Sequence, residues 1–309
     1  GQQLRSRAIV LATGGTAAMW SRTTNPAGAV GGGLLVAYGA GAELADLELM
    51  QFHPTAVVGR NGADGFLVTE AVRGEGALLI DAGGQRFVDE LAPRDEVARA
   101  IAGRMRATGA PSVGLDMRDI DPALFPNVVG ELRRAGIDPQ HELIPVAPAA
   151  HYMMGGISTD LHGRSSLPGL YAVGECSCTG LHGANRLASN SLTECFVFGA
   201  RAAQAALAEP AGAGPPEPEG TAASAPAPLS PASREALWRY AGIERNGEGL
   251  RTLSADDHPL VRLIARSALT REESRGAHQR TDFPSTEASW DGAHVTLGAG
   301  REPAADRWN

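Results

Sequence analysis

The sequence predicts an α/β protein, and two observations carry that prediction. Arg7 to Ala12 is an apolar run of strand length that ends in Thr13-Gly14-Gly15, which is typical of a parallel-sheet strand whose tip approaches a ligand. A second short apolar run, Gly169 to Val173, leads through a loop of small polar residues into a helical apolar run from Ser191 to Ala203. The order strand, small-residue loop, helix presents backbone N–H groups to an anion or a polarised ligand.

Composition places the chain among globular proteins and excludes several classes of function. Its 309 residues are enough for one large domain or two to three smaller ones, and 43% of them are hydrophobic. The formal net charge of -8 argues against a nucleic-acid partner, because no basic field would attract phosphates. No apolar run approaches the length of a membrane span, so we expect no membrane partner. The sequence has no lysine, which excludes Schiff-base chemistry by a lysine of this chain.

The three cysteines, Cys176, Cys178 and Cys195, predict neither a disulfide framework nor a metal site. The Cys-Ser-Cys spacing of the first two is not a zinc pattern, and an odd number of cysteines fits reduced thiols in the cytoplasm. We therefore expect a cytoplasmic protein without a bound metal, in which the cysteines are small core or loop residues.

The middle of the chain predicts further strands and helices. Gly33 to Leu49 has the pattern of a helix that runs into a strand, and Leu47 to Pro54 predicts a strand with alternating apolar residues. Residues 54 to 150 predict a mixed α/β region. Its elements are expected at Glu96 to Arg106 (helix), Val113 to Met117 (strand) and Phe125 to Ala135 (helix).

The last third of the chain changes in composition. Ala211 to Ser233 is rich in Pro, Ala, Gly and Ser without an apolar period, which predicts a linker. Residues 285 to 309 show little periodicity and predict partial disorder. Short helices are expected at Glu235 to Ile243, Leu250 to Leu253 and Pro259 to Leu269.

Several single residues have a structural interpretation as well as a functional one. His53 stands before a proline, where the backbone is kept out of a helix, and a lone histidine is more often a core or surface residue. Arg94 precedes a predicted helix and could equally be a surface arginine. Arg73 and Glu75 could equally form a structural ion pair.

Three sequence blocks resemble the signature of one flavoprotein family. They are His151 to Gly156 (HYMMGG), Gly169 to Glu175 (GLYAVGE) and His182 to Leu192 (HGANRLASNSL). The family contains the flavoprotein subunits of succinate dehydrogenase and fumarate reductase together with L-aspartate oxidase. The residue sequence of the third block is most similar to the L-aspartate oxidase branch. The resemblance covers most of residues 8 to 200 and, more weakly, 265 to 284.

The resemblance implies a glutathione-reductase-like α/β FAD-binding domain, present in part, with an inserted α+β capping domain and a C-terminal helical region. The family's phosphate-binding G-x-G-x-x-G turn is absent, and Gly32 stands where the family has an aspartate, so we expect a fragment that binds FAD weakly. The expected parts are FAD-binding at 1–53 and 151–210, capping at 54–150, a linker at 211–233 and the helical region at 234–309.

The resemblance also implies a site for a small dicarboxylate beside an FAD cofactor. The reaction implied is oxidation of L-aspartate to iminoaspartate by hydride transfer to flavin N5, the first step of NAD synthesis through quinolinate. Arg94 is implied as the catalytic residue that moves a proton. The substrate-binding residues implied are His53, Thr69, Glu70, His151 and Arg186. The cofactor-binding residues implied are Thr13, Gly14, Gly15, Glu175, Asn190, Ser191 and Leu192.

The resemblance also implies electron acceptors and a protein partner. Oxygen or fumarate is implied as the electron acceptor, and quinolinate synthase as a protein partner. Two other interpretations stay open. One is a succinate- or fumarate-converting flavoprotein, and the other is an inactive remnant that folds without FAD.

Overall fold

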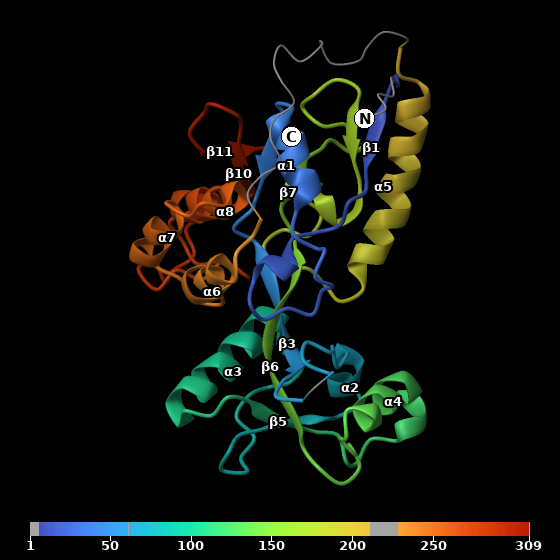
Figure 1. The fold of residues 1–309 in the computed structure, drawn as a ribbon, viewed down its shortest axis with the longest axis vertical. Helices are drawn as coiled ribbons and strands as arrows, with labels where there is room; N and C mark the ends of the chain where they lie inside the picture. The colour runs from blue at the N-terminus through green and yellow to red at the C-terminus, as the bar shows by residue number, and fades with distance from the viewer. Residues whose placement is uncertain (1–5, 61, 211–227, 309) are drawn as a thin grey trace. The chain divides into compact units, whose positions relative to one another are not determined.

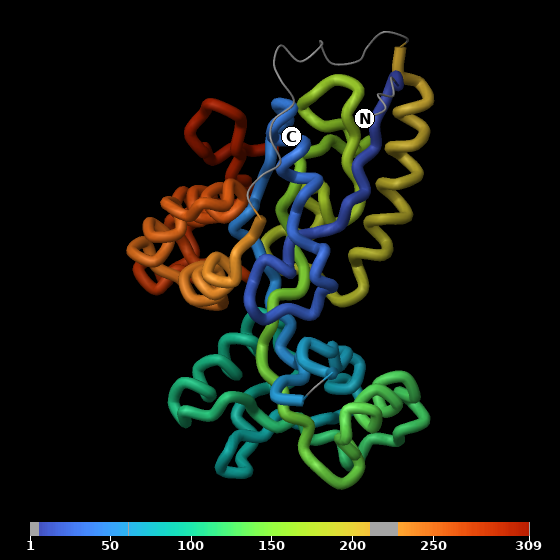
Figure 2. Tube along the Cα trace, viewed as in Figure 1, coloured from blue at the N-terminus to red at the C-terminus, as the bar shows by residue number. Residues whose placement is uncertain are grey.

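The computed structural model describes residues 6–60, 62–210 and 228–308 (Figure 1). The chain folds into two compact units: unit 1 consists of residues 1–21, 27–50 and 152–309, and unit 2 of residues 22–26 and 51–151. Figure 2 follows the chain from unit 1 into unit 2 after residue 50 and back after residue 151. Most of the predicted linker, residues 211–227, lies outside the described residues. None of the described helices is long and apolar enough to cross a membrane.

The predicted parallel strand pair is present in unit 1. Strand β1 (Ile9–Leu11) pairs in parallel with β8 (Leu170–Ala172), so Val10 stands opposite Tyr171. Helix α5 (Asn190–Leu207) runs alongside, and its inner face packs against Tyr171 (Figure 1). The predicted order of strand, loop and helix is therefore confirmed.

A second sheet of unit 1 joins segments that are far apart in the sequence. Its strand order is β11-β10-β2-β7-β9, and its pairs are antiparallel except for β7 with β9. The two C-terminal strands show that the predicted partial disorder of residues 285 to 309 is wrong. Val295 and Leu297 alternate with polar residues and are buried, but this apolar pattern is too short to stand out from its polar flanks. The bounds are β2 Leu44–Ala45, β7 Gly156–Ser158, β9 Ser177–Cys178, β10 Ala293–Leu297 and β11 Ala304–Arg307.

Three helices of unit 1 lie close to the positions predicted for the C-terminal region. The first of them begins inside the last residues of the predicted linker. Ser230 caps it by accepting a hydrogen bond from the Ser233 N–H, and a proline occupies the first turn. The helices of unit 1 besides α5 are α1 Gly32–Gly39, α6 Pro231–Tyr240, α7 Gly247–Leu253 and α8 Pro259–Thr270, with short 3-10 helices at Ala17–Met19, Gly174–Cys176 and Ala288–Trp290.

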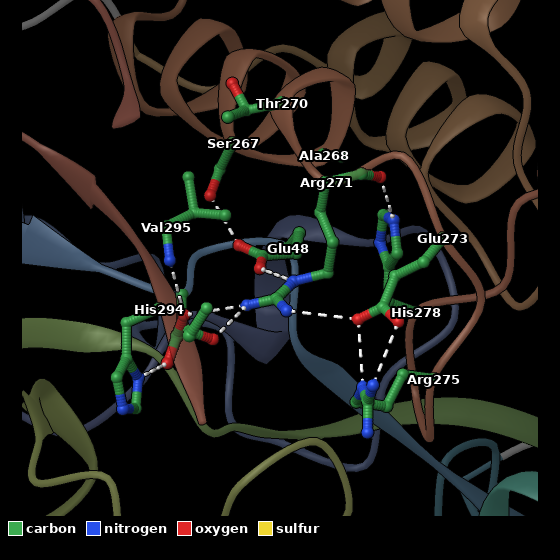
Figure 3. Close-up of polar contacts among 12 residues, drawn as sticks. Glu48, Ser267, Ala268, Thr270, Arg271, Glu273, Arg275, His278, His294 and Val295 are labelled. Atoms are coloured by element: carbon green, nitrogen blue, oxygen red, sulfur yellow. Dashed lines mark hydrogen bonds and ion pairs between the residues drawn. The ribbon is translucent and has the colours of Figure 1, made fainter. Parts of the chain in front are cut away.

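A buried ion-pair network connects the end of α8 to the segment after β2 (Figure 3). Arg271 places Nε 2.6 Å from Glu48, Nη2 3.3 Å from Asp46 and Nη1 3.2 Å from Glu273. Burial raises the pKa of Glu48. Burial acts to lower the pKa of Arg271, but Glu48 and Asp46 outweigh it and hold the pKa above its usual value. The guanidinium and its carboxylates thus fix these two segments to each other.

Unit 2 is a four-stranded sheet with three helices around an apolar core. The strand order is β3-β6-β5-β4, and β5 is antiparallel to both of its neighbours, β4 and β6. The core includes Leu79, Leu115 and Ile144 from the sheet and Ile101 and Leu132 from the helices. This agrees with the mixed α/β prediction. The bounds are β3 Met50–Val57, β4 Leu78–Ile80, β5 Val113–Asp116, β6 Ile144–Met153, α2 Glu70–Gly74, α3 Arg94–Thr108 and α4 Pro126–Arg134, with a 3-10 helix at Pro122–Leu124.

Two strands of unit 2 differ from what the sequence indicated. Strand β3 is buried along its whole length, polar residues included, so its alternation does not mark an exposed face. Strand β6 is ten residues long and was not predicted, because Pro145 and Pro148 disfavour a central strand. The Pro145 carbonyl still accepts a hydrogen bond from the Val58 N–H over 3.0 Å, so the prolines do not end the pairing.

Candidate functional site

Two histidines predicted to bind substrate lie edge to face in unit 2. His53 on β3 and His151 on β6 have ring centroids 5.2 Å apart at an interplanar angle of 71°. The Thr55 N–H donates to Nδ1 of His53 over 3.3 Å, so the neutral ring carries its proton on Nε2. Nδ1 of His151 lies 2.8 Å from the Thr24 hydroxyl. Two imidazoles oriented by neighbouring polar groups are suited to binding a carboxylate.

Arg94, the predicted catalytic residue, is the first residue of α3, and its side chain is buried. Its Nε donates to Oε2 of Glu70 over 2.6 Å, and its Nη1 donates to Oε1 of Gln51 over 3.0 Å. The Glu70 side chain is 38% exposed, so the pair reaches the surface of unit 2. Charge-assisted hydrogen bonds to two acceptors hold this guanidinium in a defined position.

Arg73 belongs to the same ion-pair group. Its Nη2 lies 3.5 Å from Glu70, and its Nη1 donates to the Glu90 carbonyl oxygen. Burial lowers the pKa of Arg73, and Glu70 opposes that shift. The ion pair of Arg73 with Glu75 considered from the sequence is wrong, since Glu75 is exposed and Glu70 is the partner.

Thr69, predicted to donate a hydrogen bond to substrate, is the N-cap residue of α2. Its backbone has φ -56 and ψ 148, and its hydroxyl makes no capping hydrogen bond to the helix. The side chain is half-buried next to Glu70 in the sequence. The hydroxyl is therefore not used in capping the start of the helix.

Arg186 in unit 1 stands at one end of a buried polar chain. Its guanidinium carbon lies 4.2 Å from the centroid of the Tyr152 ring, a cation–π contact. The Tyr152 hydroxyl donates to Glu194 over 3.0 Å. Glu194 also lies 2.9 Å from Nε2 of His182 and accepts a hydrogen bond from the Thr179 hydroxyl over 2.6 Å. The arginine thus rests on a ring that is itself held by a buried carboxylate.

The protonation states in this chain follow from burial and charge. Burial and the nearby Glu194 raise the pKa of Tyr152 far above its usual value, so the phenol stays a donor. Burial acts to raise the pKa of Glu194, but hydrogen bonds from His182 and Thr179 outweigh it and leave the pKa below its usual value. Glu194 is therefore an anion, and the groups around it act as donors.

The Glu175 side chain lies beside Gly15, in the loop that follows β1. Its Oε1 accepts a hydrogen bond from the Met153 N–H over 3.0 Å, and a Cβ added to Gly15 would stand 2.0 Å from the same oxygen. Gly14 has φ +73 with open space beside it, and Thr13 is exposed. Burial is the main cause that raises the pKa of Glu175 to about 7. Near neutral pH this carboxyl can both donate and accept hydrogen bonds.

The remaining predicted cofactor residues form the first turn of α5. The helix begins at Asn190, and Ser189 before it has φ 60, in the left-handed region. The Leu192 N–H donates to the Ser189 carbonyl oxygen over 3.2 Å, so this donor is used within the turn. The Ser191 hydroxyl lies 3.5 Å from Nη1 of Arg186. The turn therefore places a helix N-terminus next to the buried arginine.

Four residues that support these groups were not singled out from the sequence: Thr24, Gln51, Tyr152 and Glu194. Two of them carry a sequence signal, because Tyr152 lies in the first matched block and Glu194 follows the third block. Their importance comes from partners that are distant in the sequence, such as Thr24 for His151, and these appear only in the fold.

Comparison with known families gives two matches. Residues 1–192, more than half of the chain, match the family described as FAD binding domain. Residues 258–302 match the family described as fumarate reductase flavoprotein C-term. The two matches follow each other along the chain.

Curated relatives of the chain include two named L-aspartate oxidase. The protein of Caulobacter vibrioides is 48% identical over 326 residues, which include 97% of this chain and 62% of the relative. The protein of Nostoc sp. is 54% identical over 214 residues, or 65% of this chain and 37% of the relative. The chain therefore spans less than two thirds of the length of these relatives.

Two of the solved structures with a similar fold come from E. coli and Mycobacterium smegmatis. A variant of E. coli quinol fumarate reductase has a TM-score of 0.80 at 29% identity and covers 97% of this chain and 64% of its own. Mycobacterium smegmatis Sdh1 in complex with UQ1 has a TM-score of 0.77 at 30% identity and covers 98% of this chain and 62% of its own.

Proposed function

The chain belongs to the FAD binding domain family, and on that premise we propose that the protein oxidises L-aspartate to iminoaspartate with FAD as cofactor. The observation that carries the proposal is the alignment with an L-aspartate oxidase over 97% of the chain, with 48% of the aligned residues identical. The geometry supports it. Unit 2 holds the His53–His151 pair and the Arg94–Glu70 pair, which are suited to binding and deprotonating an amino dicarboxylate.

The residues at the tip of β1 fit a flavin cofactor. Gly15 leaves no room for a side chain beside Glu175, and Gly14 adopts a conformation that favours glycine. Among the described residues, the buried Thr16 hydroxyl has no hydrogen-bond partner, as expected where a polar ligand completes the site. Thr13, Gly14, Gly15 and Glu175 would contact FAD on this side. FAD, when bound, supplies the acceptor for the hydride that leaves Cα of the substrate.

The first turn of α5 would hold the other end of the flavin ring system. Asn190, Ser191 and Leu192 stand at the positive end of the helix dipole, which favours negative charge on a bound group. The Ser191 N–H is the donor we assign to this role, because the Leu192 N–H already donates to Ser189.

Substrate binding is assigned to cationic and polar side chains. In unit 2, His53 and His151 are assigned to carboxylate binding, and the Thr69 hydroxyl is assigned a further hydrogen bond to substrate. In unit 1, Arg186 is assigned to carboxylate binding. Oxidation removes a hydride from Cα and a proton from the amino group. We assign that proton to Oε2 of Glu70, which Arg94 holds in place by a hydrogen bond of 2.6 Å, because a guanidinium is a poor base.

The finer points of the proposal rest on the same resemblance. They comprise a partial FAD-binding domain with an inserted capping domain and a C-terminal helical region, and hydride transfer to flavin N5. They also comprise fumarate or oxygen as electron acceptor and a place in NAD synthesis ahead of quinolinate synthase in the cytoplasm. The reaction that consumes the product must take up an unstable imino dicarboxylate, which favours a closely associated partner enzyme.

A second candidate is the interconversion of succinate and fumarate, favoured by the fumarate reductase fold match at a TM-score of 0.80. The two are separated by assaying the purified protein with L-aspartate and with succinate in parallel. With FAD supplied in excess, we expect flavin reduction and peroxide formation with L-aspartate in air. Reduction by succinate without any reaction of L-aspartate would overturn the proposal, and a protein that binds no flavin even with FAD in excess would support the inactive remnant.

A further inference from the structure

Three side chains of unit 1 bring a carboxylate, a thiol and an imidazole together. Asp46 follows β2, Cys178 ends β9 and His294 lies in β10. Their donor atoms all lie within 4.8 Å of one another. Oδ2 of Asp46 is 2.5 Å from Nδ1 of His294 and 3.6 Å from Sγ of Cys178. We propose that these three residues bind one divalent transition-metal ion, with Zn²⁺ as the best match.

Two of the three distances between the ligand atoms agree with tetrahedral coordination after a small movement. Zn–S at about 2.3 Å and Zn–O at about 2.0–2.2 Å separate sulfur and oxygen by about 3.6 Å at the tetrahedral angle. The Cys178 Sγ and Asp46 Oδ2 already stand 3.6 Å apart. Oxygen and nitrogen around zinc stand about 3.3 Å apart. The His294 ring therefore has to move by somewhat under 1 Å from its present separation of 2.5 Å.

Neighbouring groups orient two of the three ligands. Oδ1 of Asp46 accepts hydrogen bonds from the Val295 N–H over 2.9 Å and from Nη2 of Arg271 over 3.3 Å, which directs Oδ2 towards the other two ligands. The His294 ring stacks on Trp308 with centroids 3.9 Å apart and planes at 12°. Figure 3 shows His294 and Val295 on the same side of Arg271. Such outer contacts fix the geometry of metal ligands.

The local charge favours a divalent cation. Asp46 supplies a carboxylate to the cluster, and Cys178 supplies a thiolate when a metal ion displaces its proton. A Zn²⁺ ion that displaces the thiol proton makes the metal, thiolate and carboxylate neutral together. The positive charge of Arg271 does not oppose this, because Glu48 and Glu273 also pair with it.

A cavity of unit 1 is lined in part by residues that adjoin two of the three ligands. The cavity has a volume of about 640 Å³, and its lining includes Thr179, the residue after Cys178, and Trp308, the ring that stacks on His294. Its lining also carries the polar side chains of Ser158 and Thr159. Three protein ligands with one open position form a known class of zinc site.

The site revises the expectation that the protein binds no metal. That expectation rested on the spacing of Cys176 and Cys178, which is not a zinc pattern. The proposed site uses only the second of these cysteines. It takes Asp46 from the segment after β2 and His294 from β10. A bound ion would connect the C-terminal hairpin of β10 and β11 to the rest of the sheet.

The test uses Co²⁺ as a spectroscopic probe on the purified full chain after chelator treatment. We expect one equivalent to bind, with a thiolate-to-cobalt charge-transfer band and the intense visible bands of tetrahedral cobalt, and Zn²⁺ to displace it. Cys178→Ser should abolish the charge-transfer band. His294→Gln should weaken binding by at least the ~10–100-fold typical of losing a supporting group.

Two matched variants keep the test decisive if Cys178→Ser does not fold. Cys176→Ser removes a buried thiol that donates to the Leu11 carbonyl, and Cys195→Ser removes an exposed thiol. Retention of the band in both variants assigns it to Cys178 by elimination. Binding of less than one equivalent, absence of the charge-transfer band, or its loss in Cys176→Ser alone would overturn the proposal.

Discussion

At the scale of single residues, Arg186 is the side chain whose loss should affect substrate most. Arg186→Leu should weaken dicarboxylate binding without changing flavin content, because losing a buried carboxylate clamp costs roughly 2–5 kcal/mol, about 30-fold or more in affinity. Titration of the flavin spectrum of FAD-saturated protein with L-aspartate or succinate measures this. Arg201→Leu, which removes an exposed arginine of α5, is the control and should bind normally. Unchanged affinity in Arg186→Leu would contradict the assignment.

Glu175 should give the flavin-free protein a pH-dependent stability. Its pKa is about 7 in the folded protein against the usual 4.5, so between these values the folded state binds more protons than the unfolded state. The free energy of unfolding should therefore fall as pH rises from about 4.5 to about 7, by up to about 3 kcal/mol.

Urea unfolding across that pH window tests this prediction. Glu175→Gln removes the titrating group and should flatten the dependence, whereas Glu235→Gln, at an exposed position, should leave it in place. The same slope in Glu175→Gln and the unmodified protein would show that another group causes it.

The candidate site could be predicted from the sequence as far as its residue types, but not its internal contacts. The matched blocks contain His151 and Arg186, and the family resemblance implies His53 and Arg94. The partner of Arg94 could not be chosen between several acidic residues, and the structure identifies Glu70 at 2.6 Å. Hydrogen-bond partners separated by tens of residues depend on strand pairing, which the local sequence does not encode.

At the scale of elements, the ion-pair network at the end of α8 should contribute strongly to stability. Arg271→Leu leaves the buried carboxylates of Asp46 and Glu48 without their cation, which should lower the free energy of unfolding by about 3–5 kcal/mol. Arg266→Leu on the same helix removes a pair whose partner, Glu302, is 92% exposed, and should cost under about 1 kcal/mol. Chemical denaturation compares the two, and equal costs would contradict this account.

The helices were predicted more completely than the strands, for a physical reason. Helices α3, α5 and α8 carry an apolar face over three or more turns, and a proline stands at the start of α3 and of α8. Strand β6 contains prolines, and β10 has few apolar residues, so neither has a clear local pattern. Both strands are stabilised by pairing with partners elsewhere in the chain, and that information is non-local.

At the scale of the whole molecule, a destabilising substitution in one unit should reduce the protection of backbone amides against hydrogen exchange in that unit alone. Leu115→Ala in the core of unit 2 should cost about 2–5 kcal/mol, as should Ile264→Ala in unit 1, because both side chains are buried. Hydrogen exchange followed by mass spectrometry should show faster exchange across residues 51–151 for the first variant and across residues 152–308 for the second. Faster exchange throughout the chain in both variants would argue against two separate cores.

The pairing of β10 with β2 also has a consequence for synthesis on the ribosome. Leu44 and Ala45 of β2 cannot pair with Thr296 and Leu297 of β10 until those two residues have been synthesised, roughly 250 residues later. At about 5–20 residues per second, the nascent chain holds this edge unpaired for roughly 10–50 seconds. An unpaired edge can recruit other chains, and late closure over a long loop is slow. Chaperone occupancy during translation should therefore persist until the last strands emerge.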